Sequence, residues 1–361
     1  MTIAYSGDSI TFPDNSVQNT AATGFGFKNR LINGQMVINQ RGWSGNITTG
    51  NEYTLDRFQG VASVTSKFSV AQSTSIYPAG FNNSLLVTST SAYTVGAAEQ
   101  FLLRQNIEAY NTNDLAWGTA SASTVTLSFR VYSSLTGTFG GALFNSNGSR
   151  SYPFTYSIPT ANTWTTISIT IAGDTSGTWA GTNGVGITVS WGLGVGSTYS
   201  GTAGSWSGNY YASATGAVSV VGTSGATFYI TGVQLEKGST ATSFDYRPYG
   251  TELALCQRYF YRANGAGNNG PFGFGYYTAT TEAAIGVPFP IVMRSIPTFT
   301  SSAASTFLIQ DNANRTPTAL TMQCSSVSYA SIIFTLTGAT AGNGTKVLDN
   351  GAANLSFASE L

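Results

Sequence analysis

The sequence contains no histidine, so it lacks the side chain that most often serves as a general base, a transition-metal ligand or the base of a nucleophilic triad. Two carboxylates could still cleave a glycosidic bond if they lay about 5–9 Å apart on either side of it. The acidic residues are few and scattered singly, among them Asp174, Glu236, Asp245 and Glu282. Glu236 and Asp245 are expected to be strand-end carboxylates in ion pairs. The neighbouring basic residues are Lys237 and Arg247. The sequence therefore predicts a protein that is not an enzyme.

Aromatic residues in glycine-rich segments offer a different chemistry, which is sugar binding. An aromatic ring stacks on the apolar face of a sugar while neighbouring amides and hydroxyls hydrogen-bond its oxygens. One dense group lies between residues 179 and 211, and another follows the Asn/Gly-rich stretch 263–270. The alternative for both groups is packing in a core or against another subunit. The candidates for glycan binding are Trp179, Trp191, Tyr199, Trp206, Tyr210, Tyr211, Phe274, Tyr276 and Tyr277.

The low charge content of the sequence bears on which partners the protein could bind. Only 8% of the residues are charged and the formal net charge is zero, whereas about a quarter of the residues of a typical soluble domain are charged. Nucleic acid is excluded as a partner because no basic track follows a phosphate backbone. No apolar window approaches the roughly 20 residues of a membrane span, so no membrane insertion is expected, and the N-terminus does not resemble a signal peptide. A surface this poor in charge suits an extracellular assembly.

The sequence predicts short β-strands, which would position the aromatic candidates for glycan binding. Residues 123–132 and 164–171 alternate β-branched or aromatic residues with polar ones, which predicts half-buried strands. Clusters of Gly, Asn and Ser separate such segments, and helical periodicity is almost absent. Residues 252–262 are ambiguous between helix and strand in their first half and favour a strand in the second. The pattern predicts an all-β protein, an antiparallel jelly-roll β-sandwich followed by a second, smaller β-sandwich domain, with an extended N-terminal segment.

Composition shifts divide the chain into three parts. Residues 1–30 carry small residues and glycines that cannot build a core alone, so this segment should order only against another chain. Pro248 and Gly250 interrupt the strand pattern. We therefore expect an N-terminal attachment or trimerisation segment at 1–30, a sandwich at 31–247 and a terminal β-domain at 248–361.

Several further residues are expected to have structural roles. Strand aromatics should fill the core, and Arg41, Asp56 and Arg57 should form an ion-paired cluster that fixes the start of the sandwich. Cys256 and Cys324 form no CxxC pattern and are expected to be buried apolar residues. The core aromatics expected are Phe68, Phe129, Tyr132, Trp164 and Phe334.

Several motifs resemble the modular tail-fibre and appendage proteins of bacteriophages. SITFPDNSVQNTAA (9–22) is similar to an element that opens fibre chains, with Asn15 in place of the usual Gly. NRLINGQMVINQRG (29–42) with YTLDRF (53–58) is similar to the opening of a jelly-roll module akin to carbohydrate-binding domains, with Phe58 where Trp is more usual. The segment 228–262 resembles the closing strand of that module and its continuation into the terminal domain. The segments 288–300 and 355–361 resemble motifs of the C-terminal part of such proteins.

The resemblance implies a fold, partners and a place in the particle. It implies a homotrimer whose N-terminus attaches to other virion proteins, with Phe12, Pro13 and Asp14 as the attachment residues, and whose C-terminal domain is distal. Jelly-roll carbohydrate modules often carry a structural calcium ion, for which Asn33, Asp56 and Glu236 could supply oxygen ligands. No other cofactor is expected, because the glycine-rich pieces lack the Lys-Ser/Thr ending of a phosphate loop.

The leading hypothesis is a structural tail fibre of a phage virion that attaches to host-surface glycans. The first alternative is a head fibre on the capsid or a baseplate protein with an architectural role. The second is a glycan-degrading tailspike, which no motif in the sequence supports.

Overall fold

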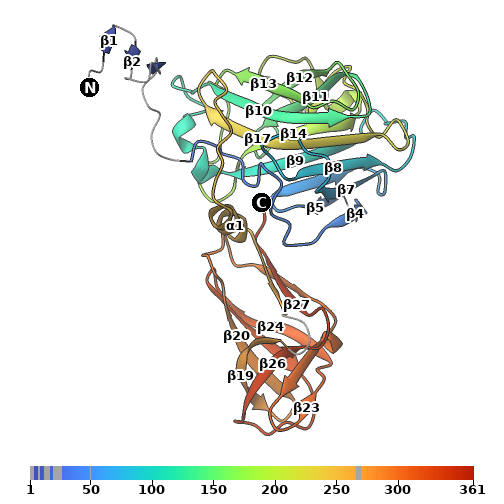
Figure 1. The fold of residues 1–361 in the computed structure, drawn as a ribbon, viewed down its shortest axis with the longest axis vertical. Helices are drawn as coiled ribbons and strands as arrows, with labels where there is room; N and C mark the ends of the chain where they lie inside the picture. The colour runs from blue at the N-terminus through green and yellow to red at the C-terminus, as the bar shows by residue number, and fades with distance from the viewer. Residues whose placement is uncertain (1–3, 7–8, 12–16, 19–26, 49, 266–269) are drawn as a thin grey trace.

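The computed structural model describes residues 27–48, 50–265 and 270–361, and the backbone of three short strands before them; the side chain of Cys324 is not described. A large sandwich is followed by the single helix of this part of the chain and by a smaller, narrower β-domain beneath it (Figure 1). The expected all-β class is thereby confirmed. The three short strands, which form an antiparallel sheet, are β1 (Ala4–Ser6), β2 (Ser9–Thr11) and β3 (Val17–Gln18).

The sandwich consists of two antiparallel sheets of six strands each. The first sheet has the order β13 (Thr165–Ile171), β10 (Val125–Ser133), β17 (Thr227–Lys237), β8 (Ser84–Ser89), β7 (Phe68–Ser73) and β4 (Ser44–Asn46). The second sheet has the order β12 (Ser151–Ile158), β11 (Gly137–Phe144), β14 (Val185–Val195), β9 (Gln100–Glu108), β6 (Phe58–Ala62) and β5 (Asn51–Tyr53).

Alternation along the strands builds the core between the sheets. Strands β10 and β13 confirm the strands predicted at 123–132 and 164–171. Phe68 and Phe129 are buried in this core as expected. Tyr132 and Trp164 are not part of it: they are partly exposed and contact each other with tilted rings whose centroids are 5.6 Å apart. The reason is the pleat, because Phe129 and Val131 point inward and Tyr132 therefore points outward.

A long excursion after β14 covers part of the outer face of the second sheet. Its two short parallel strands are β15 (Ser200–Gly201) and β16 (Ser213–Ala214). The Ser190 hydroxyl donates a hydrogen bond to the Ala212 carbonyl at 2.9 Å, which ties the excursion to the sheet. The remaining local elements are the 3-10 turns η1 (Ala109–Asn111), η2 (Asn113–Leu115), η3 (Ser197–Tyr199) and η4 (Ala304–Thr306).

Helix α1 (Tyr249–Gln257) resolves the segment that was ambiguous in the sequence. Tertiary packing selects the helix, because Cys256 and Tyr259 are buried against Ile32 and Ile38. The expectation of a buried, unpaired cysteine is confirmed for Cys256. Among the described residues, no helix has the length and apolar character needed to cross a membrane.

The terminal domain is a second β-structure with its own core, which includes Phe307, Phe334 and Phe357. Phe334 is thus buried as expected, but in this core. A three-stranded sheet has the order β18 (Phe260–Asn264), β27 (Asn354–Ala358) and β21 (Thr298–Ser301). A curled sheet has the order β23 (Asn314–Arg315), β22 (Phe307–Gln310), β26 (Gly344–Asp349), β19 (Pro271–Ala279), β20 (Glu282–Pro288), β25 (Tyr329–Thr335) and β24 (Ala319–Ser325).

Candidate functional site

A joint of buried charges connects the sandwich to the terminal domain. Arg41 and Arg57, from the start of the sandwich, both form ion pairs with Glu360, which follows β27. The Arg57 side chain is only 1% exposed. Its guanidinium also lies over the Tyr259 ring, 3.6 Å from the centroid. The predicted ion-paired cluster therefore exists, but its acid is Glu360, because the Asp56 carboxylate accepts hydrogen bonds from Gln40 instead.

A second set of contacts strengthens this joint. Arg258, just after α1, donates two hydrogen bonds to Glu108 at 2.9 and 2.6 Å, and the Tyr259 hydroxyl donates a third at 2.6 Å. Burial raises the pKa of Glu108, but these hydrogen bonds outweigh it and hold the pKa below its ordinary value. Arg294, from the loop after β20, donates to the carbonyls of Ser359 and Asn183, one in each domain.

Segments 29–42 and 228–262, which are far apart in the sequence, meet at this joint. Gln40 donates to the Phe260 carbonyl at 2.7 Å, and Arg262 donates to the Arg41 carbonyl at 2.8 Å. The Asn33 side-chain amide donates hydrogen bonds to the carbonyls of Ile38 and Asp56 and accepts one from the Ile38 N–H. These two segments therefore build part of the connection between the domains.

The predicted calcium ligands do not come together as a group. The carboxylate of Glu236 accepts hydrogen bonds from Gln234 and Thr242, away from the Asn33 and Asp56 contacts. No group of three or more Cys, Asp or Glu side chains able to hold a metal occurs among the described residues. The Asp245–Arg247 ion pair is present at 3.7 Å, whereas Lys237 lies 3.8 Å from Asp114.

The predicted aromatic residues of the sandwich separate into three environments. Trp191 is fully buried between the sheets, packed edge-on against Phe129 at 5.7 Å, so its ring cannot reach a ligand. The sequence could not show this, because the glycines around Trp191 suggested a loop while the structure places it inside β14.

Trp179 and Trp206 pack against Trp117, a residue that the sequence did not single out. The centroid distances from Trp117 are 4.8 and 5.3 Å. The indole N–H of Trp206 donates to the Ala172 carbonyl at 2.8 Å, and that of Trp117 donates to the Ser123 carbonyl at the same distance. These contacts make a small core for three loops, and the role of Trp179 and Trp206 in glycan binding stays a prediction.

The third environment is the excursion over the second sheet. Tyr199 and Tyr210 pack edge-on at 5.6 Å, and the Tyr210 hydroxyl donates to Gln100 at 3.0 Å. The Tyr211 ring lies against Gly201, where a Cβ atom would collide with it. All three tyrosines are partly exposed. They anchor the excursion, and their role in glycan binding stays a prediction.

The terminal domain carries the most exposed rings of the predicted set. Phe274 is 78% exposed and Tyr276 is 56% exposed, both on β19. Tyr277, the next residue, is buried and accepts a hydrogen bond from Arg315 at 2.9 Å. The pleat of the strand separates them, so Tyr277 belongs to the core while the other two rings lie on the outer face. Tyr329, 43% exposed and not predicted, lies on β25 of the same sheet.

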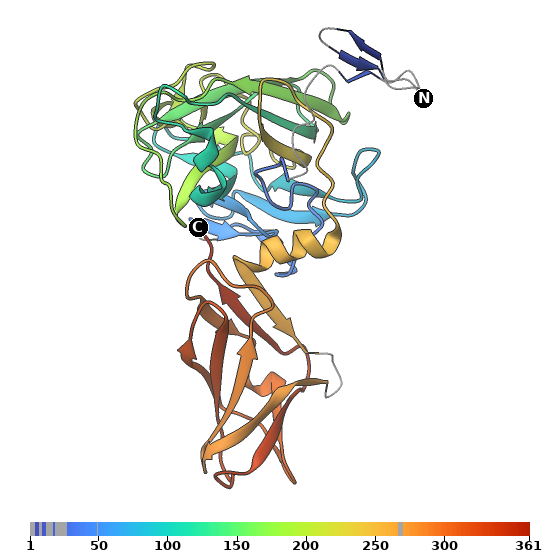
Figure 2. The same ribbon diagram turned by 90° about the vertical axis from the view of Figure 1, so that its left-hand side faces the viewer.

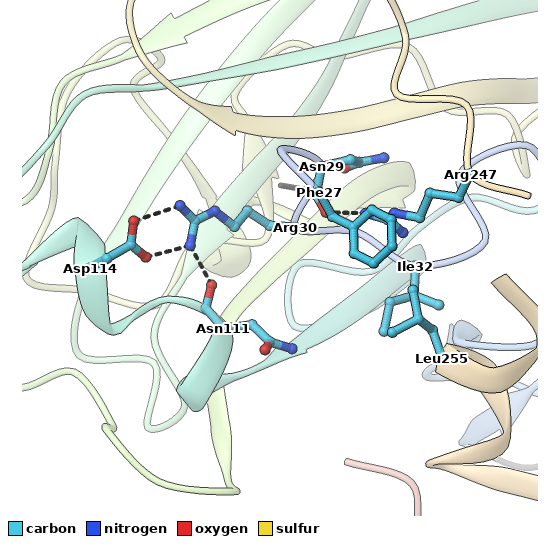
Figure 3. Close-up of a pocket in the computed structure, with 8 residues that line it drawn as sticks. All are labelled: Phe27, Asn29, Arg30, Ile32, Asn111, Asp114, Arg247 and Leu255. Atoms are coloured by element: carbon cyan, nitrogen blue, oxygen red, sulfur yellow. Dashed lines mark hydrogen bonds and ion pairs between the residues drawn. The ribbon is translucent and has the colours of Figure 1, made fainter. Parts of the chain in front are cut away.

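A pocket of about 340 Å³ lies beside the joint, where α1 approaches the sandwich. Figure 3 shows the Arg30 side chain reaching Asp114 and the Asn111 carbonyl, and the Phe27 ring beside Arg247. The charged side chains of the pocket therefore interact with other residues of the chain and stabilise the walls of the pocket. Its lining residues are Phe27, Asn29, Arg30, Ile32, Asn111, Asp114, Arg247 and Leu255. The predicted attachment residues Phe12, Pro13 and Asp14 lie outside the described residues.

The comparisons with known proteins find distant likenesses only. No family model and no curated protein matches the sequence. A putative sugar binding protein from Bacteroides thetaiotaomicron matches with a TM-score of 0.33 and 11% identity over 58% of this chain and 100% of that chain. The family 11 carbohydrate-binding module of a Clostridium thermocellum cellulase matches with a TM-score of 0.28 and 12% identity over 55% and 98%.

A phage protein is also among the similar structures. The enzymatically active domain of tailspike protein 4 from bacteriophage CBA120 matches with a TM-score of 0.31 and 12% identity. The match covers 58% of this chain and 21% of the tailspike chain. Likenesses this distant leave the function to be argued from the residues of the chain itself.

Proposed function

We propose that the chain is a structural, adhesive protein of a bacteriophage virion, a tail fibre that attaches the particle to glycans on the host surface. The observation that carries the proposal is the joint: Glu360 binds Arg41 and Arg57, and Glu108 binds Arg258. Charged contacts of this kind hold the terminal domain in one orientation on the sandwich. A joint of this kind suits a fibre tip, because it fixes which surface of the terminal domain faces outward.

The shape of the molecule supports the same proposal. The sandwich and the terminal domain lie one after the other along the longest axis, with α1 between them (Figures 1 and 2). The labelled strands β1 and β2 lie on the sandwich side of the molecule, away from the terminal domain (Figure 1). Attachment to the particle through residues 1–30 would therefore leave the terminal domain outermost.

The distribution of charge supports a binding role without catalysis. The buried Asp174 carboxylate accepts two hydrogen bonds from Arg150, at 2.7 and 2.6 Å. Glu108 and Glu360 are held by arginines in the joint. Acids that are paired in this way stabilise the fold and do not provide a free proton donor beside a nucleophile. We propose that a homotrimer carries these surfaces, since several weak sugar contacts on one particle combine into firm attachment.

The proposal is tested with the purified full chain and bacterial cells. Labelled protein is mixed with a panel of bacteria, before and after periodate oxidation of their surface sugars, and an antibody to residues 270–361 is applied to particles that carry the chain. Binding to particular cells that periodate abolishes, with antibody label at the end of the tail, is the expected result. Label on the capsid and no binding to cells would instead support an architectural head fibre, and release of sugar fragments would support a tailspike enzyme.

A further inference from the structure

We infer that the outer face of strands β19, β20 and β25 is a sugar-binding platform of three rings, Phe274, Tyr276 and Tyr329, across which a neutral, linear glycan lies. This inference rests on the proposed function and specifies the contact surface and the class of ligand. Phe274 and Tyr276 were candidates from the sequence, whereas Tyr329 is added by the structure.

The strand register brings the three rings to one face. Tyr276 is paired with Ala284, and Ala284 is paired with Ile333 on β25. Paired residues of antiparallel strands point to the same side of a sheet. The same register, carried one residue further, brings Phe274 alongside Gly286. The middle strand contributes the small residues Ala284 and Gly286 to this face, and Pro288 pairs with Tyr329.

Gly286 allows the Tyr329 ring to lie across the sheet. A Cβ atom at Gly286 would collide with the Tyr329 hydroxyl oxygen and would also meet Cζ at 2.8 Å and Cε2 at 2.9 Å. The ring therefore occupies the space above the glycine, with 43% of the residue still exposed. Its hydroxyl reaches the row of residues that contains Phe274. A ring held over a glycine in this way is positioned before a ligand arrives, which lowers the entropy lost on binding.

One charge of each sign flanks the rings, which favours a ligand without net charge. Lys346 pairs with Phe274 on the neighbouring strand β26. Glu282 stands two residues before Ala284 on β20, on the same face of the sheet. Ser331, which pairs with Gly286, supplies a hydroxyl on the other side. Rings flanked by hydroxyl groups match a sugar, whose ring faces are apolar and whose edges carry hydroxyls.

The size of the platform argues against a second copy of the chain as its occupant. An aromatic side chain buries about 150–250 Å² when it is fully covered. Three partly exposed rings could thus contribute roughly 300–400 Å², below the about 800 Å² per partner of a standard protein interface. Tyr329 and Phe274 stand on strands separated by β20, whose backbones are about 10 Å apart at ordinary strand spacing, and the Tyr329 ring lies over the middle strand between them. A ligand of two or more linked sugar rings would cover all three side chains.

The test uses the full chain and single substitutions in the three rings. The probes are neutral disaccharides and tetrasaccharides, cellobiose, cellotetraose and their xylose equivalents, and the purified surface polysaccharide of a bacterium that the chain binds. Binding is measured by titration calorimetry. We expect Tyr329→Ala to weaken polysaccharide binding about tenfold. The wild-type preference for the longer chains should shrink with it, because one end of the platform is lost.

Gly286→Ala and Tyr110→Ala complete the design. Gly286→Ala removes no ring, but it displaces Tyr329, so it should weaken binding as much as Tyr329→Ala while Phe274 and Tyr276 remain. Tyr110→Ala removes a tyrosine that is similarly exposed on the sandwich and should leave binding unchanged. Thermal melting checks that each variant is folded.

The outcomes separate this inference from the proposed function. If the wild type binds cells and polysaccharide, and Tyr329→Ala and Gly286→Ala bind as the wild type does, the platform is wrong while the fibre function stands. If the ring substitutions change the sedimenting mass and not sugar binding, the face is a contact between subunits and the inference fails. If the wild type binds neither cells nor any of these glycans, both proposals fail.

Discussion

The carboxylate of Glu108 couples the joint to pH. Its hydrogen bonds from Arg258 and Tyr259 outweigh the effect of burial and lower the pKa of this group in the folded protein. A carboxyl group whose pKa is lower in the folded than in the unfolded state stabilises the fold above its unfolded pKa. This stabilisation is lost as the pH falls through the folded-state pKa.

We therefore predict a pH-dependent effect of Glu108→Gln. At pH 7 the variant should lose about 1.5–3 kcal/mol of unfolding free energy, because Arg258 then has a neutral partner. The difference from the wild type should shrink as the pH falls below about 4, where the wild-type carboxylate is protonated too. Urea unfolding of both proteins at pH 7, 5 and 3 measures this difference in unfolding free energy. Burial raises the pKa of Asp56, but both proteins carry that residue and its contribution cancels. A difference that stays constant with pH would contradict this account.

At the scale of elements, the segment 29–42 packs closely against strand β17, and this contact restricts which residues it can contain. Asn33 adopts a left-handed conformation with φ of 60°, and the next residue, Gly34, lies against the carbonyl of Val233 in β17. The Gly34 carbonyl accepts a hydrogen bond from the Val233 N–H at 3.0 Å. A side chain at position 34 would push this segment off the sandwich.

We predict that Gly34→Ala lowers the free energy of unfolding by about 1–3 kcal/mol, the usual cost of forcing an atom into a filled space. Gly45→Ala is the matched control, because a Cβ atom there has nothing within 4 Å. The control should change stability by less than about 1 kcal/mol, in either direction. Chemical denaturation of the two variants and the wild type measures both effects. Equal stability of the two variants would show that the Val233 contact can relax.

The elements show how far the sequence could predict the fold. Alternation predicted strands such as β10 and β13, because burial of every second residue follows from the pleat itself. Helix α1 could not be predicted from its own residues alone. Its helical conformation is stabilised by contacts of Cys256 with Ile32 and Ile38, which lie far away in the chain. The pleat also decides which aromatic residues are accessible, as Tyr276 and Tyr277 show on neighbouring positions.

The candidate site was predictable only in part. Phe274 and Tyr276 were found because they follow an Asn/Gly-rich stretch, and the structure places both rings on an outer face. Tyr329 was missed because its relation to Phe274 depends on the pairing of β19, β20 and β25. Composition does not encode that register. The alternation of Tyr329 and Ser331 with buried residues was the signal that could have suggested an outer face.

At the scale of the whole molecule, the position of the terminal domain depends on a few buried charges. Glu360 joins Arg41 and Arg57, and the Arg57 side chain is almost wholly enclosed. Removing one partner of such a pair leaves the other charge buried without compensation, which costs more than the pair contributes to folding. An exposed pair, such as Arg30 with the 54% exposed Asp114, is screened by water and contributes little.

We predict that Glu360→Gln loosens the joint and that Asp114→Asn does not. Glu360→Gln should lower the free energy of unfolding by about 3 kcal/mol, whereas Asp114→Asn should lower it by less than about 1 kcal/mol. Small-angle X-ray scattering of the wild type should fit one elongated arrangement of the two domains. The Glu360→Gln protein should need several arrangements, since Arg41 and Arg57 no longer hold an ionised partner. If it scatters and unfolds as Asp114→Asn does, the apolar contacts around Cys256 and Tyr259 hold the domains together without these charges.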